Sequence, residues 1–195
     1  MVSFSSNGGT AEGYLVTPAS GKSPGVIVMQ EWWGLNDNIK GIADRFAAEG
    51  FLALAPDLYH GKVTAEPDEA GKMMMAMKMD EAAKDKAGAY DYLKAHAACT
   101  GKVGSVGFCL GGGLSLYVST LRPVDATVIY YGALPGVQPD LSKVAGPVLG
   151  HYAQNDGWAS PEAAAALEKQ LKDLGKSVEF HQYAGTEHGF FNDTR

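Results

Sequence analysis

The sequence predicts an α/β fold in which a mostly parallel, twisted sheet carries helices on both faces. Short apolar runs of strand length alternate with segments whose apolar residues recur at helical spacing. Several of these runs are apolar throughout, which is typical of parallel strands buried on both faces. The chain also contains 25 glycines, several of them beside these runs, where sharp strand-to-helix turns need them.

The composition is that of a globular protein with one core. Of 195 residues, 46% are hydrophobic and 19% charged, and no repeat or linker divides the chain, so we expect one domain over residues 1–195. The net charge of −6, without a basic block, argues against nucleic-acid and membrane-surface partners. We therefore expect a small-molecule partner, and a chain that is a monomer or a weak homodimer.

Cysteine usage and the N-terminus indicate a cytoplasmic protein. Cys99 and Cys109 fit neither a disulfide framework nor a zinc spacing, and no His, Cys and carboxylate cluster has metal-ligand spacing, so we expect no metal or other cofactor. Residues 1–9 lack the basic and apolar regions of a signal peptide. Residues 103–121 carry no charge, but internal glycines favour a buried strand, a turn and a helix over a membrane span.

The first half of the chain contains two predicted strands and three predicted helices. Residues 25–29 form a buried strand, and Asn36 caps the helix that follows and ends at Gly50. The apolar positions of this helix are Ile39, Ile42, Ala43 and Phe46. Residues 51–55 form the next strand. A polar loop and two helices, from about residue 68 to residue 96, complete this half.

The second half repeats the alternation. Residues 102–108 predict a third buried strand and residues 110–120 a helix, with Cys109 at their junction. Further strands are predicted at residues 126–131, 148–152 and 177–183. A helix begins after Ser160 and ends before Gly175. Residues 184–195 are predicted to form a loop.

The segment GFCLGG at residues 107–112 has the pattern of a nucleophile elbow with cysteine in place of serine. A strand that reverses into a helix within a few residues leaves no room for side chains two positions either side of the nucleophile, so glycine is needed there. The turn also brings the Leu110 N–H and the helix N-terminus beside the sulfur, where both favour negative charge. The alternative is a buried cysteine in a glycine-rich packing turn.

A thiol nucleophile needs a base and an acceptor that orients the base. In α/β-hydrolase folds the chain order is nucleophile, acid, histidine, and Asp156 is the acid candidate at a strand end after Cys109. His188, on the loop after the last strand, is preferred over His181, which lies within that strand. The alternatives are a turn or helix-capping aspartate and a surface-loop histidine.

Glu31 ends a buried strand and leads into Trp32 and Trp33, so its carboxylate lies next to large indoles. Burial there is expected to raise its pKa and to let it share a proton with a thiol. The backbone N–H of Trp32 is the expected second donor to the oxyanion. The alternative is a glutamate near a helix, with both tryptophans in the core.

These residues resemble the dienelactone hydrolase family. The resemblance covers nearly the whole chain and rests on QEWWGLN at 30–36, APDLY at 55–59, GFCLGG at 107–112, the Asp156 loop and EHGF at 187–190. It implies an α/β-hydrolase fold, a Cys109, Asp156 and His188 triad, and an oxyanion hole of the Leu110 and Trp32 amides. It further implies that Glu31 holds the resting thiol neutral until substrate arrives.

The family reaction implied by the resemblance opens 4-carboxymethylenebut-2-en-4-olide to maleylacetate through a thioester, in chloroaromatic breakdown. Family members hold the substrate carboxylate with two arginines, and Arg195 suits one of these positions. The other region has no arginine, so Lys72 is the expected substitute. Trp33 and Tyr59 are further predicted substrate contacts. The alternatives are a broader carboxylesterase or thioesterase of the same fold, or a ligand-binding sensor without turnover.

Two more features of this region depart from the resemblance. Several methionines gather beside Lys72, namely Met73, Met74, Met75, Met77 and Met79. They favour an adaptable core face, with a flexible pocket wall as the alternative. The resemblance also implies one more helix after the histidine loop, whereas the sequence stops at Arg195, so that either the chain is clipped or this helix is dispensable. If the helix is missing, we expect lower stability and a looser His188 loop.

Overall fold

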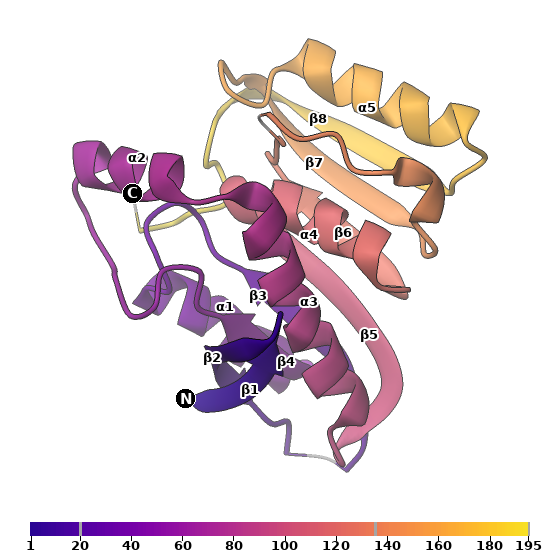
Figure 1. Cartoon of the computed structure of the whole chain (residues 1–195). Helices are drawn as coiled ribbons and strands as arrows, with labels where there is room; N and C mark the ends of the chain where they lie inside the picture. The colour runs from indigo at the N-terminus through magenta and orange to yellow at the C-terminus, as the bar shows by residue number, and fades with distance from the viewer. Residues whose placement is uncertain (20, 135, 195) are drawn as a thin grey trace.

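In the computed structural model, which describes residues 1–19, 21–134 and 136–194, eight strands form one sheet in the order β1-β2-β4-β3-β5-β6-β7-β8 (Figure 1). They are β1 (Val2–Ser6), β2 (Gly9–Val16), β3 (Ser23–Met29), β4 (Leu52–Pro56), β5 (Cys99–Phe108), β6 (Ala126–Tyr130), β7 (Val148–Asn155) and β8 (Val178–Glu187). Neighbouring strands along the sheet from β4 to β8 are parallel, and the antiparallel pairs within these ranges are β1 with β2 and β2 with β4. The predicted mostly parallel sheet is confirmed.

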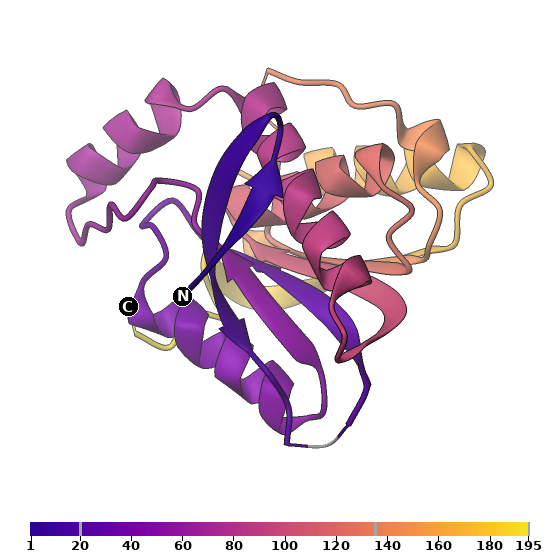
Figure 2. The same cartoon turned by 60° about the horizontal axis from the view of Figure 1, so that its bottom comes forward.

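Helices cover both faces of this sheet, also as predicted (Figure 2). On one face, alternate residues of β3 such as Val26 pack with Ile39 of α1 (Asp37–Ala48). On the other face, Ile27 packs with Leu93 of α3 (Met79–Ala95). The helices α4 (Leu110–Leu121) and α5 (Pro161–Asp173) pack on this second face, together with the short helix η1 (Leu141–Lys143). This arrangement follows from the twofold alternation of side chains along a strand.

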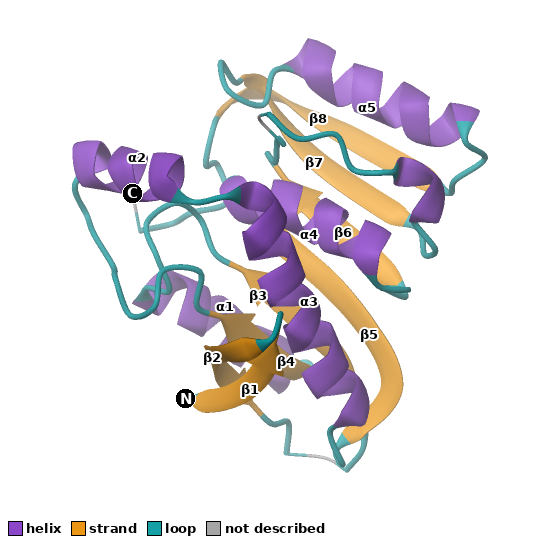
Figure 3. Cartoon of the chain, viewed as in Figure 1, coloured by secondary structure: helices purple, strands orange, loops and turns teal. Residues whose placement is uncertain are grey.

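The helix α2 (Pro67–Ala76) is set off from the sheet by loops at both ends (Figure 3). The methionine-rich segment therefore spans two helices, since Met73 to Met75 belong to α2 and Met79 begins α3. Most of these methionines pack against the core, but Met75 is 84% exposed. Met73, Met74, Met77 and Met79 thus pack on a core face as predicted, and Met75 does not.

The N-terminal hairpin of β1 and β2 was not predicted. Its two-residue turn is Asn7-Gly8, with φ of 46° and 81°, and it closes on the pair Ser6 and Gly9. Asn-Gly is the preferred sequence for such a turn, because both central residues need positive φ. This dipeptide was the signal that would have revealed the hairpin.

Most other predicted elements are present, with shifted ends. The Asn36 side chain accepts a hydrogen bond from the Ile39 N–H at 3.1 Å, which confirms the predicted start of α1. The prediction of a loop over residues 184–195 was wrong for its first four residues. The strand β8 continues to Glu187, which pairs with Asn155 of β7 beyond a bulge. Among the described helices, none is long and apolar enough to cross a membrane.

Candidate active site

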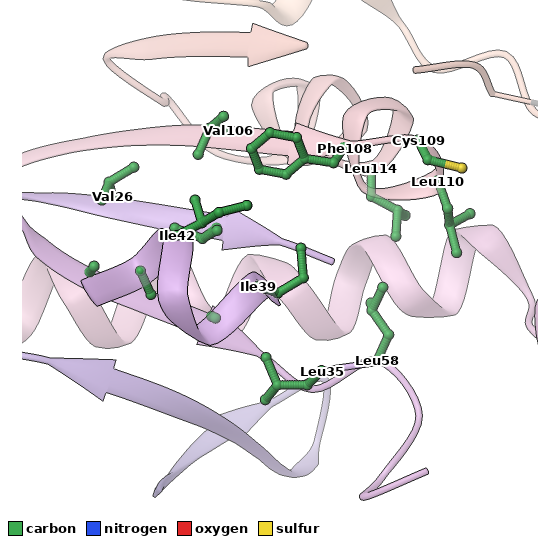
Figure 4. Close-up of a cluster of buried hydrophobic side chains, with 14 of the residues drawn as sticks. Val26, Leu35, Ile39, Ile42, Leu58, Val106, Phe108, Cys109, Leu110 and Leu114 are labelled. Carbon is green, nitrogen blue, oxygen red and sulfur yellow. The ribbon is translucent and has the colours of Figure 1, made fainter. Parts of the chain in front are cut away.

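Cys109 occupies a strained turn between β5 and α4, with φ 55° and ψ −121°. A Cβ on Gly107 would lie 1.9 Å from the Gly111 carbonyl oxygen, and one on Gly111 would lie 2.4 Å from that of Gln30. The predicted requirement for glycine on both sides of Cys109 is therefore confirmed. Figure 4 shows Cys109 at the edge of the core cluster, with its sulfur directed away from Phe108. Left-handed backbone at a non-glycine residue is uncommon and is typical of functional sites.

The side chains of His188 and Asp156 are hydrogen-bonded to each other. His188 Nδ1 lies 2.7 Å from Asp156 Oδ2, and the Asp156 side chain is fully buried. The other carboxylate oxygen, Oδ1, accepts from the backbone N–H groups of Trp158 and Ala159 at 2.8 and 2.9 Å. The imidazole is also in edge contact with the Tyr131 and Trp158 rings. Since Nδ1 is engaged by Asp156, Nε2 is the ring nitrogen left for proton transfer.

One cavity of about 440 Å³ brings five of the sequence-predicted residues together, namely Glu31, Trp32, Trp33, Cys109 and His188. Cys109 and His188 both line it, although they come from opposite ends of the second half of the chain. The described residues that line it are Glu31, Trp32, Trp33, Met74, Cys109, Trp158, His188, Gly189 and Asn192. Glu31, Cys109, Trp158 and His188 each follow the carboxyl end of a strand, where ligands of such sheets bind, and Met74 comes from α2.

The environment of Cys109 keeps its thiol protonated at neutral pH. Burial raises the pKa of Cys109 to about 12, and the negative charges of Glu31 and Asp156 add to this rise. The backbone N–H groups of Leu110 and Trp32 act on the same sulfur and lower its pKa. The two predicted oxyanion donors thus both approach the sulfur.

Glu31 is held by residues that the sequence did not reveal. Its side chain is buried, and Oε1 accepts a hydrogen bond from the Tyr131 hydroxyl at 3.2 Å while Oε2 accepts one from Asn192 Nδ2 at 2.6 Å. The Asn192 side-chain oxygen accepts from the N–H and the hydroxyl of Thr194 at 3.0 and 2.7 Å, which fixes the orientation of the amide. Tyr131 directly follows β6, and this position at the carboxyl end of a strand could have identified it as a candidate site residue.

The sequence model described as the dienelactone hydrolase family matches residues 11–195. The chain belongs to the dienelactone hydrolase family. Protein usf of Aquifex pyrophilus is 39% identical over 204 residues, covering 100% of this chain and 88% of that protein. Carboxymethylenebutenolidase of Pseudomonas putida is 29% identical over 202 residues, covering 97% of this chain and 84% of that protein.

A solved structure agrees with the family. The crystal structure of a dienelactone hydrolase-like promiscuous phosphotriesterase from metagenomic libraries superimposes with a TM-score of 0.87 at 26% identity, covering 97% of this chain and 82% of that one. Membership of the family, the α/β-hydrolase fold and the class of enzyme, a hydrolase of ester or lactone bonds, are thereby confirmed.

Within this dienelactone hydrolase fold, the predicted substrate contacts are divided. Trp33 lines the cavity, but Lys72 is exposed and is absent from the described lining. Met74 takes the inward position on α2, and residues two apart on a helix point to nearly opposite sides. Tyr59 is buried and lines a different cavity, beside Lys86. Arg195 lies outside the described residues.

Proposed function

We propose that the protein hydrolyses an activated enol lactone or ester through Cys109 as nucleophile, His188 as base and acid, and Asp156 as the group that orients His188. The observation that carries this proposal is the 2.7 Å hydrogen bond between His188 and Asp156 beside a cavity that also contains the Cys109 thiol. A nucleophile, a base and an orienting carboxylate are the parts that acyl transfer needs.

In the resting enzyme the thiol is neutral, and the negative charge of Glu31 helps to keep the proton on sulfur. When substrate enters, this proton passes from Cys109 Sγ to His188 Nε2, and the thiolate attacks the carbonyl carbon. The oxyanion that forms accepts hydrogen bonds from the Leu110 and Trp32 N–H groups. Loss of one such donor typically costs about 3–4 kcal/mol in the transition state.

The tetrahedral intermediate collapses when the bond between the carbonyl carbon and the ester oxygen breaks. The leaving enolate takes the proton from His188, and a thioester on Cys109 remains. His188 then removes a proton from water, and the resulting hydroxide attacks the thioester carbon. The carbon–sulfur bond breaks, the carboxylic acid leaves, and the imidazolium returns its proton to sulfur. A thiol that stays protonated between turnovers also resists oxidation.

The proposed substrate is a dienelactone, which opens to maleylacetate. A second candidate is an uncharged ester or thioester, favoured by one observation. Among the described residues that line the cavity, none is lysine or arginine, and three of them are tryptophan. An apolar wall without a cation suits an uncharged acyl group better than a carboxylate.

The test is loss of ultraviolet absorbance from cis- and trans-dienelactone, with 4-nitrophenyl acetate assayed in parallel. We expect the wild type to turn over dienelactone, and we expect kcat/KM to be at least about 10³-fold lower in Cys109→Ala. The matched control is Cys99→Ala, because Cys99 is the second buried free cysteine and lies away from the cavity. Equal turnover by Cys109→Ala and wild type would contradict the proposal, and turnover of the acetate alone would select the second candidate.

A further inference from the structure

The helix α2 borders the cavity beside Cys109 but is loosely attached to the rest of the fold (Figure 1). Of its ten residues, Ala70 alone is buried, and α2 packs closely on no other helix or strand of the described chain. The side chain of its N-cap residue, Glu66, makes no capping hydrogen bond. A segment with so few buried contacts moves at little cost in free energy. The helix can therefore shift without disrupting the core.

Met74 is the residue that α2 contributes to the lining of this cavity. The other described lining residues belong to segments that follow β3, β5, β7 and β8, so the sheet holds them in place. Met74 is partly exposed, and an unbranched thioether side chain adapts to the space around it. The wall at Met74 can thus move while the proposed catalytic groups stay fixed.

A second cavity, of about 370 Å³, lies beside another side of α2. Met73 and Ala76 of α2 line it, and Leu58 and Lys86 are among the residues of its other walls. It shares no described residue with the cavity beside Cys109. Protein interiors are normally close-packed, so an element that moves needs free volume next to it. This second cavity supplies such volume for α2.

We propose that α2 is a movable wall of the active-site cavity and that Met74 determines which sizes of substrate fit. A bulky acyl group displaces the Met74 side chain, and α2 shifts toward the cavity that Met73 and Ala76 line. A small acyl group leaves α2 in place. One loosely packed helix thus adjusts the cavity, while Cys109 and His188 keep their positions at the edge of the sheet. This selection of substrates rests on the proposed hydrolysis at Cys109.

The test compares hydrolysis of 4-nitrophenyl hexanoate and 4-nitrophenyl acetate, as the ratio of their kcat/KM values. A general loss of fold or of catalysis cancels in this ratio, because both esters share one leaving group and one set of catalytic residues. Met74→Trp fills the active-site cavity, and Ala76→Trp, at an exposed position, fills the second cavity alone. We expect each to lower the ratio at least about tenfold, which is typical of steric discrimination by a pocket that cannot adapt. Met75→Trp is the matched control, because Met75 is exposed and lines neither cavity, and we expect it to leave the ratio unchanged.

A second readout does not depend on turnover. The rates at which N-benzyliodoacetamide and iodoacetamide alkylate Cys109 are measured by mass spectrometry of the peptide that contains it, and their ratio reports how large a reagent the cavity admits. We expect this ratio to fall in Met74→Trp and Ala76→Trp and to stay unchanged in Met75→Trp. If the wild type hydrolyses neither ester, the proposed function fails, and the alkylation ratios still decide whether α2 moves. Wild-type ratios in Ala76→Trp would overturn the proposal even if Met74→Trp lowers them, because Met74 would then belong to a fixed wall.

Discussion

Asn192 donates a 2.6 Å hydrogen bond from Nδ2 to Oε2 of Glu31, and this contact joins the histidine loop to the carboxyl end of β3. Both groups are buried, and the amide is oriented by Thr194 from behind. The carboxylate that raises the pKa of Cys109 is thus itself held by the loop that carries His188.

Asn192→Ala is expected to make the Cys109 thiol more reactive while turnover falls. Without the Asn192 donor, and with the Tyr131 hydroxyl still in place, Glu31 binds a proton more readily, so less negative charge faces the sulfur and the pKa of Cys109 falls. A hydrogen bond to a charged group contributes about 1.5–3 kcal/mol, and we expect its loss to raise the rate of iodoacetamide alkylation at pH 8. Asn155→Ala, at an exposed site, is the control. An unchanged alkylation rate would show that Asn192 does not influence the reactivity of the Cys109 thiol.

Asp156→Asn is expected to lower kcat by about 10²–10⁴-fold with little change in fold, because an amide does not hold the imidazole in the tautomer that accepts a proton at Nε2. Steady-state kinetics with circular dichroism measure both effects. Asp44→Asn, which alters an exposed hydrogen bond to Tyr14, is the matched control. A kcat within threefold of the wild type would remove Asp156 from the proposed triad.

Gly107→Ala is expected to destabilise the protein by more than about 3 kcal/mol, since the added Cβ would overlap the Gly111 carbonyl oxygen and force the elbow apart. Gly41→Ala is the control, because a Cβ there meets nothing within 4 Å and lies in the middle of α1. That change is expected to be neutral or to stabilise by up to about 1 kcal/mol. Chemical denaturation compares the two, and equal stabilities would contradict the steric account of the elbow.

Lys86 is expected to make stability rise with pH in the alkaline range. Burial lowers its pKa to about 8 from 10.5, against the opposing charges of Asp85 and Asp57, while its amine donates to the Asp57 carbonyl at 2.6 Å. Between these two pKa values the unfolded chain binds more protons than the folded one, so the free energy of unfolding rises as pH rises. The cost of burying the charged amine is present in full below pH 8 and is on the order of 3 kcal/mol.

The measurement is denaturation at pH 7 and pH 10 for the wild type and Lys86→Met. The wild type is expected to gain stability relative to the variant at the higher pH. Lys84→Met, at an exposed site on the same helix, is expected to show no such difference. A gap between wild type and Lys86→Met that stays constant with pH would contradict the predicted titration.

Much of the fold and the elbow could be predicted because their signals are local. The cap at Asn36, the glycines around Cys109 and the uniform apolar strands each depend on neighbours in sequence. The end of β8 could not be predicted, since it depends on pairing with β7 past a bulge. Whether Lys72 points into the cavity depends on how α2 is rotated about its axis. The residue types in that segment do not determine this rotation.

The hydrogen bonds around Glu31 were beyond prediction for another reason. Tyr131 and Asn192 lie 100 and 161 positions from Glu31, and no spacing rule connects residues so far apart. Their contact arises only when the carboxyl ends of β3 and β6 and the histidine loop meet at one edge of the sheet. The pairing of Asp156 with His188 could be predicted, because catalytic triads of α/β-hydrolases occur in the chain order nucleophile, acid, histidine, which leaves few candidates after Cys109.

The most direct test of the central claim is mass spectrometry of the wild type mixed with dienelactone and quenched in acid before the first turnover is complete, with Cys109→Ala treated in the same way. The account predicts a transient adduct equal in mass to the lactone, on the peptide that contains Cys109, because the acyl group transfers to sulfur before water releases it, and no adduct in Cys109→Ala. Absence of any adduct on Cys109, together with wild-type turnover by Cys109→Ala, would contradict it.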